Sequence, residues 1–167
     1  MKKTNILHNQ GFKGTISRIA SKVSIIALLV LFTSASTFAA DDKTAPDFKG
    51  SENFKKTFPH ATDVEYVIKN EYTMVTFMWN GLKLQSFYDL QGNAIGTSRQ
   101  ISTSDLPLSH LVNIRKEYPG YNLVEAIEFD RAGEGLCYYV TVASPKTSYV
   151  LQVSAEGNIS VFKKMKN

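Results

Sequence analysis

Two kinds of hydrophobic spacing follow one another along the chain, and their order occurs twice. Residues 47–57 carry Phe48 and Phe54 at positions that share one helical face. Phe58-Pro59 should end this helix, because the residue before a proline is pushed out of the helical region. Alternating hydrophobic positions then predict four strands, over residues 64–69, 72–79, 82–90 and 94–101. Asn80-Gly81 between the second and third strands is typical of a tight hairpin.

The second half of the chain gives the same order of signals. Ser104 or Asp105 can cap a helix that has Pro107 in its first turn, and Pro119-Gly120 ends it. The hydrophobic stripe of this helix is Leu108, Leu111, Ile114 and Tyr118. Four strands are predicted after it, over residues 123–129, 136–143, 148–153 and 159–165.

Matching positions in the two halves indicate an internal duplication. Phe58-Pro59 recurs 60 residues later as Tyr118-Pro119, and Gly92-Asn93 recurs 65 residues later as Gly157-Asn158. Five residues have therefore been added between these positions, where residues 131–135 form a glycine-rich loop. A unit of about 60 residues buries too little apolar surface to be stable alone. We therefore predict an α+β fold of two tandem repeats, residues 41–104 and 105–167, each with one helix packed on a four-stranded antiparallel sheet and both packed as one globular unit.

Residues 1–40 are predicted to be a cleaved signal peptide. Five basic residues precede an apolar run over residues 23–32, and small residues lead up to Ala40. The apolar run is shorter than the ~20 residues of a spanning helix, which disfavours a membrane anchor. We expect a periplasmic protein, or a secreted one, with no stable membrane span after cleavage.

Removal of the signal peptide changes the charge of the chain. The whole sequence has 19 basic and 15 acidic residues, an excess that by itself would suit nucleic acid or an anionic membrane. Without residues 1–40, 14 basic residues face the same 15 acidic ones. Nucleic acid is therefore not expected as a partner.

The positions of the turns and of the core resemble a known family. The aromatic-proline helix end is followed by Val64-Glu-Tyr66, by the run Phe87-Tyr-Asp-Leu-Gln-Gly92 and by Leu106-Pro107 at the second helix. Over nearly all of residues 47–165 this pattern is similar to the PepSY-like, β-lactamase-inhibitor-protein-like family of exported bacterial proteins. The resemblance implies two tandem units with one sheet face left open, and a Gram-negative periplasm. Inhibition of β-lactamase belongs to one architectural relative, whose disulfides this chain cannot form because Cys137 is its only cysteine.

The sheet face that the helices leave open is the predicted binding surface. Side chains alternate between the two faces of a strand, so Val75 and Phe77 suit the helix-covered core and their neighbours point the other way. The open face is predicted to display Met74, Thr76, Met78, Gln85, Phe87, Tyr139, Thr141, Val150 and Gln152. Aromatic and methionine side chains mixed with polar ones are typical of protein-recognition surfaces. The alternative is that this face closes against the other repeat or a second copy.

The first strand of each repeat has an ambiguous pattern. Val64, Tyr66 and Ile68 indicate one inward face, whereas Glu125, Ile127 and Phe129 indicate the other. A bulge in one of the two strands would reconcile them.

Signals for catalysis are sparse. His60 and His110 have no other ligand at a short spacing that would indicate zinc, and surface or capping roles are expected for both. Cys137 leads into a strand, where a buried and inert thiol is expected. No glycine-rich loop joins a strand to a helix as a phosphate site would. We therefore expect no enzymatic activity, no metal and no cofactor.

The function expected from the sequence is that of a noncatalytic periplasmic protein-binding module, which recognises an exported protein or peptide through the open sheet face. A specific version is an inhibitor of an exported hydrolase. The alternative is a structural or envelope-associated protein that self-associates through that face as a homodimer. A third hypothesis is a small-ligand carrier with a site in the cleft between the repeats.

Overall fold

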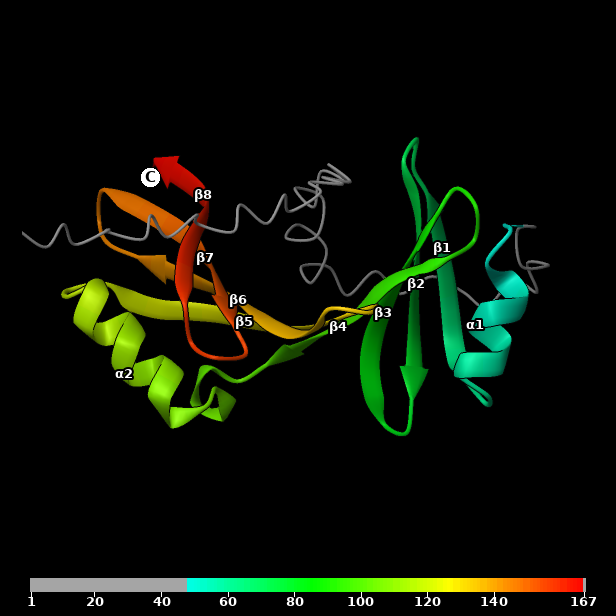
Figure 1. Cartoon of the computed structure of the whole chain (residues 1–167), viewed down its shortest axis with the longest axis horizontal. Helices are drawn as coiled ribbons and strands as arrows, with labels where there is room; N and C mark the ends of the chain where they lie inside the picture. Colours follow the sequence, from blue (N-terminus) through cyan, green and yellow to red (C-terminus); the bar gives the residue numbers. More distant parts are fainter. Residues whose placement is uncertain (1–47, 167) are drawn as a thin grey trace, which may run out of the picture. The chain divides into compact units, whose positions relative to one another are not determined.

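A computed structural model describes residues 48–166, and the predicted signal peptide lies outside them. Eight antiparallel strands form one sheet in which neighbours along the chain are also neighbours in space (Figure 1). The strands are β1 (Thr62–Ile68), β2 (Tyr72–Trp79), β3 (Leu82–Asp89), β4 (Ala94–Ile101), β5 (Asn122–Arg131), β6 (Gly135–Ala143), β7 (Thr147–Ser154) and β8 (Ile159–Lys166). Helix α1 (Ser51–Thr57) precedes β1, while the 3₁₀ helix η2 (Thr103–Asp105) and helix α2 (Leu108–Glu117) lie between β4 and β5. Neither helix of this part of the chain is long and apolar enough to cross a membrane.

The predicted strands are all present, and their ends differ from the predicted ones by at most two residues. Asn80 and Gly81 have φ values of 50° and 78°, as the predicted two-residue hairpin between β2 and β3 requires. The alternation of hydrophobic residues was therefore sufficient to locate the strands.

The pairing of β4 with β5 differs from the prediction of two four-stranded sheets. Six residues of β4, from Gly96 to Ile101, pair with β5, so the eight strands make one sheet. Arg99 and Glu128 lie opposite each other in this pairing, with 2.6 Å between Nε and Oε1. Continuous pairing satisfies the backbone groups that two separate sheets would leave exposed at their edges.

Helix α1 packs on one face of the first strands (Figure 1). Its buried residue is Phe54, whose ring lies edge-on to Phe77 at a centroid distance of 4.9 Å. The other buried residues of this core are Phe48, Val75, Leu84 and Tyr88.

Helix α2 packs on the corresponding face of the later strands, and Ile114 at its centre is fully buried. Its start and its stripe differ from the prediction. Ser104 and Asp105 belong to η2, and Pro107 occupies the N-cap position of α2. Leu108 is 76% exposed and His110 is buried. The helical period explains the exchange, because Leu108 lies about 120° around the helix from Ile114 and His110 only about 40°.

Register shifts occur in the first strand of both halves, between Thr62 and Glu65 in β1 and between Leu123 and Glu125 in β5. The prediction placed a bulge in only one of them. After its bulge β5 presents Ala126 to the core beneath α2, so Ile127 and Phe129 point to the opposite face. The sequence pattern left the face of Ile127 and Phe129 undecided, and the structure places both away from α2. Ile68, expected to point inward, is 58% exposed.

Candidate binding surface

Five aromatic rings form a row on the sheet face opposite the two helices, which we call the aromatic face. The rings belong to Tyr72 (β2), Phe87 (β3), Phe129 (β5), Tyr139 (β6) and Phe162 (β8). The centroid distances between consecutive rings are 6.1, 6.0, 6.2 and 5.1 Å. These distances and the tilted or edge-on geometries are those of stabilising aromatic pairs. Within residues 48–166, both helices pack on the other face of the sheet.

Gly96 allows the row to continue across β4, the one strand between Phe87 and Phe129. Gly96 pairs with Phe87 on one side and with Arg131 on the other. A Cβ atom at Gly96 would lie 2.7 Å from Cζ of Phe129 and 2.6 Å from the backbone oxygen of Asp130. The absence of a side chain at residue 96 therefore makes room for the Phe129 ring.

The structure places all nine residues predicted for the binding surface on this face, through the pairing of β2 with β3 and of β6 with β7. The prediction that the face displays all of them was wrong for six, which are buried: Met74, Thr76, Gln85, Phe87, Tyr139 and Val150. Three are partly exposed: Met78, Thr141 and Gln152. The partly exposed residues are accordingly the ones most accessible to a partner.

Four further residues of this face were not predicted from the sequence: Tyr72, Phe129, Phe162 and Arg131. The face of Phe129 was left undecided, because the bulge in β5 changes which side chains face α2. Phe162 lies in the edge strand β8 at a register shift, as the residue between Val161 and Lys163, which pair with Leu151 and Val150. One sequence signal could have helped. Ala126 and Ile127 are adjacent and both apolar, which indicates that β5 is buried on both faces.

Arg131 places a positively charged guanidinium in contact with the aromatic row, through Tyr139. Its Nη1 donates to Oε2 of Glu134 at 2.7 Å, and its Nη2 donates to the Tyr139 hydroxyl at 3.2 Å. Burial works to lower the pKa of Arg131, but the hydrogen bond to Glu134 and neighbouring groups outweigh it and the pKa is raised. Burial likewise raises the pKa of Tyr139. Arg131 is therefore a fixed positive charge and Tyr139 a neutral phenol at neutral pH.

Two polar atoms of the aromatic face are buried without a hydrogen-bond partner in the described part of the chain. They are Oε1 of Gln85 and Oγ of Ser98, and these two residues pair directly between β3 and β4. A buried polar atom that lacks a partner costs free energy, so this pair is a local weakness of the fold.

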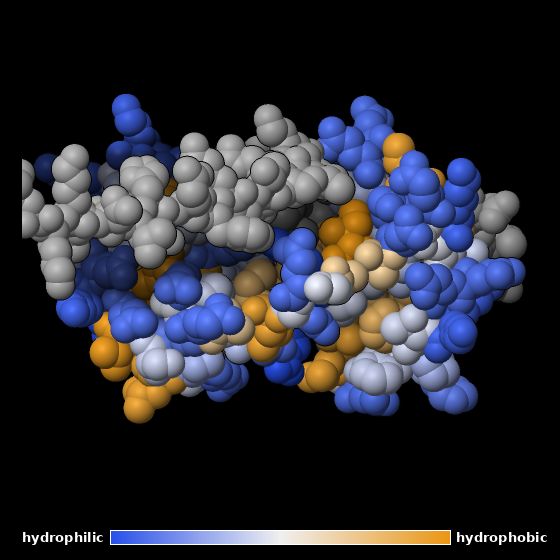
Figure 2. Space-filling model, viewed as in Figure 1, coloured by the Kyte–Doolittle hydropathy of each residue, from blue (hydrophilic) through white to orange (hydrophobic). Residues whose placement is uncertain are grey.

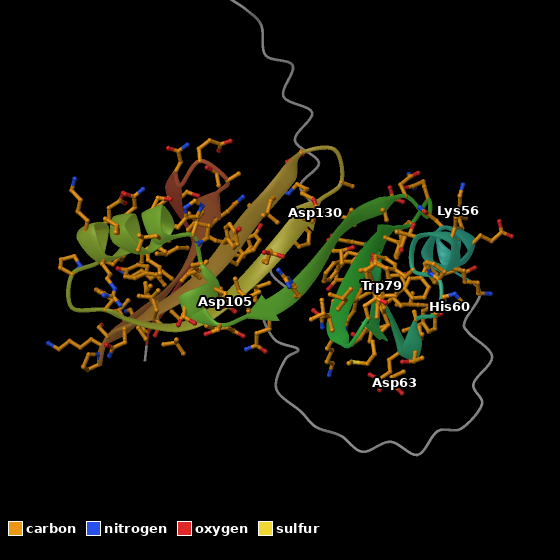
Figure 3. All side chains as sticks on the ribbon, turned by 90° about the horizontal axis from the view of Figure 1, so that it is seen from below. Lys56, His60, Asp63, Trp79, Asp105 and Asp130 are labelled. Atoms are coloured by element: carbon orange, nitrogen blue, oxygen red, sulfur yellow. The ribbon has the colours of Figure 1, made fainter. Side chains whose placement is uncertain are left out.

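Residues with catalytic or ligand-binding side chains are dispersed. His110, expected in a surface or capping role, is buried with its ring edge-on to Tyr138, because the helix turns it toward the sheet. His60 is exposed after α1, close to Trp79, whose Nε1 donates to the Pro59 carbonyl at 3.0 Å (Figure 3). Cys137 is a buried free thiol, as predicted, and burial raises its pKa, which disfavours the reactive thiolate. Among residues 48–166, no three His, Cys, Asp or Glu side chains are placed to hold a metal ion.

A smaller apolar area lies on α2, away from the aromatic face. Leu108 and Val112, one helical turn apart, are 76% and 56% exposed. Figure 2 shows hydrophobic residues at the surface in the region of α2. Exposed aliphatic residues of this kind are common on protein surfaces, so Val112 is a suitable control position for binding at the aromatic face.

Solved structures share this fold. No protein-family model and no curated protein matches the chain. A BLIP-like (β-lactamase-inhibitor-protein-like) protein from Bacteroides fragilis superposes with a TM-score of 0.60 and 20% identity, covering 75% of this chain and 89% of that one. A DUF2874 family protein from Bacteroides ovatus gives 0.63 and 17%, covering 74% and 89%. A protein from Bacteroides eggerthii that is thought to be periplasmic gives 0.62 and 14%, covering 74% and 90%. This chain therefore has the BLIP-like fold.

Proposed function

We propose that this protein is a noncatalytic periplasmic protein-binding module, which recognises an exported protein or peptide through its aromatic face. The observation that carries the proposal is the row of rings contributed by five strands, with Arg131 hydrogen-bonded to Tyr139, on the sheet face opposite the helices. Phenylalanine, tyrosine and arginine are enriched in the buried centres of protein interfaces.

Recognition would use a surface that is rigid before the partner arrives. The cores beneath α1 and α2 support the sheet from its other side, and the rings hold one another in place. Rigid side chains lose little conformational entropy on binding. Met78, Thr141 and Gln152, which are partly exposed, would make the first contacts.

We further propose that the fold arose by duplication of a PepSY-like unit, with residues 41–104 as the first repeat and 105–167 as the second. The ends of the two helices support this proposal. The C-cap residues Phe58 and Tyr118 have φ, ψ values of −120°, 67° and −122°, 61°. The turns before β4 and β8 also match, with φ values of 90° at Gly92 and 88° at Gly157.

Export through a cleaved signal peptide, residues 1–40, is part of the same proposal. The basic residues and apolar run of the sequence support it, as does the Bacteroides eggerthii protein with the same fold. Inhibition of an exported hydrolase is the specific version, in which a loop of the enzyme would lie across the aromatic face. The fold shared with a BLIP-like protein supports this version.

A site-specific cross-linking experiment tests the proposal. A photoreactive phenylalanine analogue replaces Met78 or Gln152 on the aromatic face, or Val112 on α2 as the control, in the processed protein mixed with periplasmic extract. We expect one defined partner to be linked from Met78 and Gln152 but not from Val112. Links that join two copies of this chain would support the homodimer instead, and equal labelling from all three sites would contradict recognition by the aromatic face.

A further inference from the structure

We infer that Arg131 anchors a carboxylate of the bound partner, and that Glu134 occupies this position until the partner arrives. The inference rests on the proposed function and adds the chemistry of the partner: an extended segment with an Asp or Glu beside apolar side chains. Arg131 belongs to the five residues that the second half has gained relative to the first.

The pairing of the strands leaves room beside Arg131. Its cross-strand neighbours are Gly96 on β4 and Gly135 on β6, neither of which has a side chain. The Phe129 ring leans over Gly96, whereas the space next to Gly135 is open, since a Cβ atom there would meet nothing within 4 Å. A partner can therefore approach the guanidinium from the Gly135 side.

The guanidinium has hydrogen-bonding capacity to spare. An arginine side chain carries five N–H donors in a fixed plane. Glu134 and Tyr139 each accept one hydrogen bond from Arg131, and the Arg131 side chain is 25% exposed. The two bonds fix the orientation of the plane, so that a carboxylate can bind it through two parallel hydrogen bonds.

The position of Glu134 allows a partner carboxylate to displace it from Arg131. Its side chain is 66% exposed, and it lies three residues after Arg131 in the turn between β5 and β6. An exposed ion pair of this kind contributes little to stability, because water and salt screen it. A partner carboxylate that binds the guanidinium through two parallel hydrogen bonds would gain a geometry that the single bond from Arg131 Nη1 to Glu134 does not provide.

A second arginine provides a matched control. Arg99 also pairs with a glutamate, Glu128, but the two lie directly opposite each other on β4 and β5. Their register places them on the helix side of the sheet, where Ile101 and Ala126 pack into the core. Arg99 therefore links two strands and should have no role in binding at the aromatic face.

The experiment is an NMR titration of the processed protein with two blocked tripeptides, acetyl-Leu-Asp-Leu-methylamide and acetyl-Leu-Asn-Leu-methylamide. The unchanged protein should show saturable shifts at Gly96, Arg131 and Tyr139 with the aspartate peptide, and at least tenfold weaker binding of the asparagine peptide. Arg131→Gln should remove this preference, while Arg131→Lys should retain part of it. Glu134→Gln should tighten binding of the aspartate peptide several-fold, and Arg99→Gln should leave it unchanged.

Three results would overturn the inference: no preference for the aspartate peptide, unchanged or weaker binding to the Glu134→Gln variant, or equal losses from Arg131→Gln and Arg99→Gln. The spectrum of each free variant shows whether it is folded. A partner that cross-links equally to the Arg131→Gln variant and the unchanged protein would also overturn the carboxylate inference, and the proposed function would stand. Absence of cross-links at the aromatic face would remove the proposed function, while the titration would still report on Arg131.

Discussion

The rings of Phe87 and Phe129 meet across an intervening strand, with 6.0 Å between their centroids and 59° between their planes. Phe87 on β3 pairs with Gly96 of β4, while Phe129 on β5 pairs with Ser98 and its ring reaches over Gly96. This contact connects the rings of the first four strands to those of the last four. The aromatic face is one continuous surface because residue 96 has no side chain.

Replacing Gly96 with alanine should destabilise the protein by about 1–3 kcal/mol, the usual cost of overpacking. The added methyl group would lie 2.6 Å from the Asp130 backbone oxygen, which cannot move without disturbing the β4–β5 pairing. Urea unfolding measures the change. The combination with Phe129→Ala should be less than additive, because part of the clash is with the ring. Strict additivity would show that the ring and Gly96 are independent.

Ser98→Ala should leave stability unchanged or raise it by about 1 kcal/mol, because the buried hydroxyl has no partner in the described residues. Ser86→Ala is the matched control on β3. The Ser86 hydroxyl lies 3.3 Å from that of Thr97 and is also buried, so its loss should cost about 1 kcal/mol. Urea unfolding of both variants gives the comparison, and a larger cost for Ser98→Ala would mean that its hydroxyl has a stabilising contact.

Gly92→Ala should cost more stability than Gly133→Ala. Both glycines have positive φ, at 90° and 78°, so alanine is strained at either position. Only at Gly92 would the new methyl group also meet backbone, since Lys49 C lies 2.6 Å away and a Cβ at Gly133 meets nothing within 4 Å. We expect a difference of about 1–3 kcal/mol in thermal or urea unfolding. Equal costs would show that the turn before β4 does not hold the segment before α1.

Glu125→Gln should stabilise the protein at neutral pH and lose this effect in acid. Burial raises the pKa of Glu125 above its ordinary value of 4.5. A carboxyl group whose pKa is raised in the folded state lowers the free energy of unfolding when it is ionised. This loss is complete above the folded-state pKa and declines as the pH falls through it. It is absent below the pKa of the unfolded state. Unfolding measured from pH 3 to pH 8 checks the sign. Glu65→Gln on β1 is the control, because Glu65 is exposed, and a benefit of Glu125→Gln that persists at pH 3 would contradict the account.

Local patterns located the strands because hydrophobic alternation and the Asn80-Gly81 turn are properties of adjacent residues. The start of α2 was misplaced because Ser104 and Asp105 form a separate 3₁₀ turn, and the residue before Pro107 is held in extended conformation. The stripe was misjudged for a separate reason: by the helical period Leu108 lies about 120° and His110 about 40° from Ile114, so Leu108 is exposed and His110 is buried.

The position of Phe129 depended on information that is not local. A single extra residue in a strand reverses the faces of all the residues that follow it. The contact between Phe129 and Phe87 depends in addition on the pairing of β4 with β5, which joins segments separated by η2 and α2. The nine predicted residues were placed on one face because alternation within β2, β3, β6 and β7 is undisturbed there. Arg131, one of the charged residues of the face, came from the inserted loop and had no counterpart in the first repeat to indicate its role.

The most direct test of recognition by the aromatic face is the mass of the processed protein by light scattering, alone and with its cross-linked partner supplied in purified form. The account predicts a monomer that forms a defined complex. Met78→Arg, a change on the aromatic face, should abolish the complex, whereas Val112→Arg on α2 should preserve it. A stable dimer that binds no partner, or a complex that Val112→Arg disrupts and Met78→Arg does not, would contradict it.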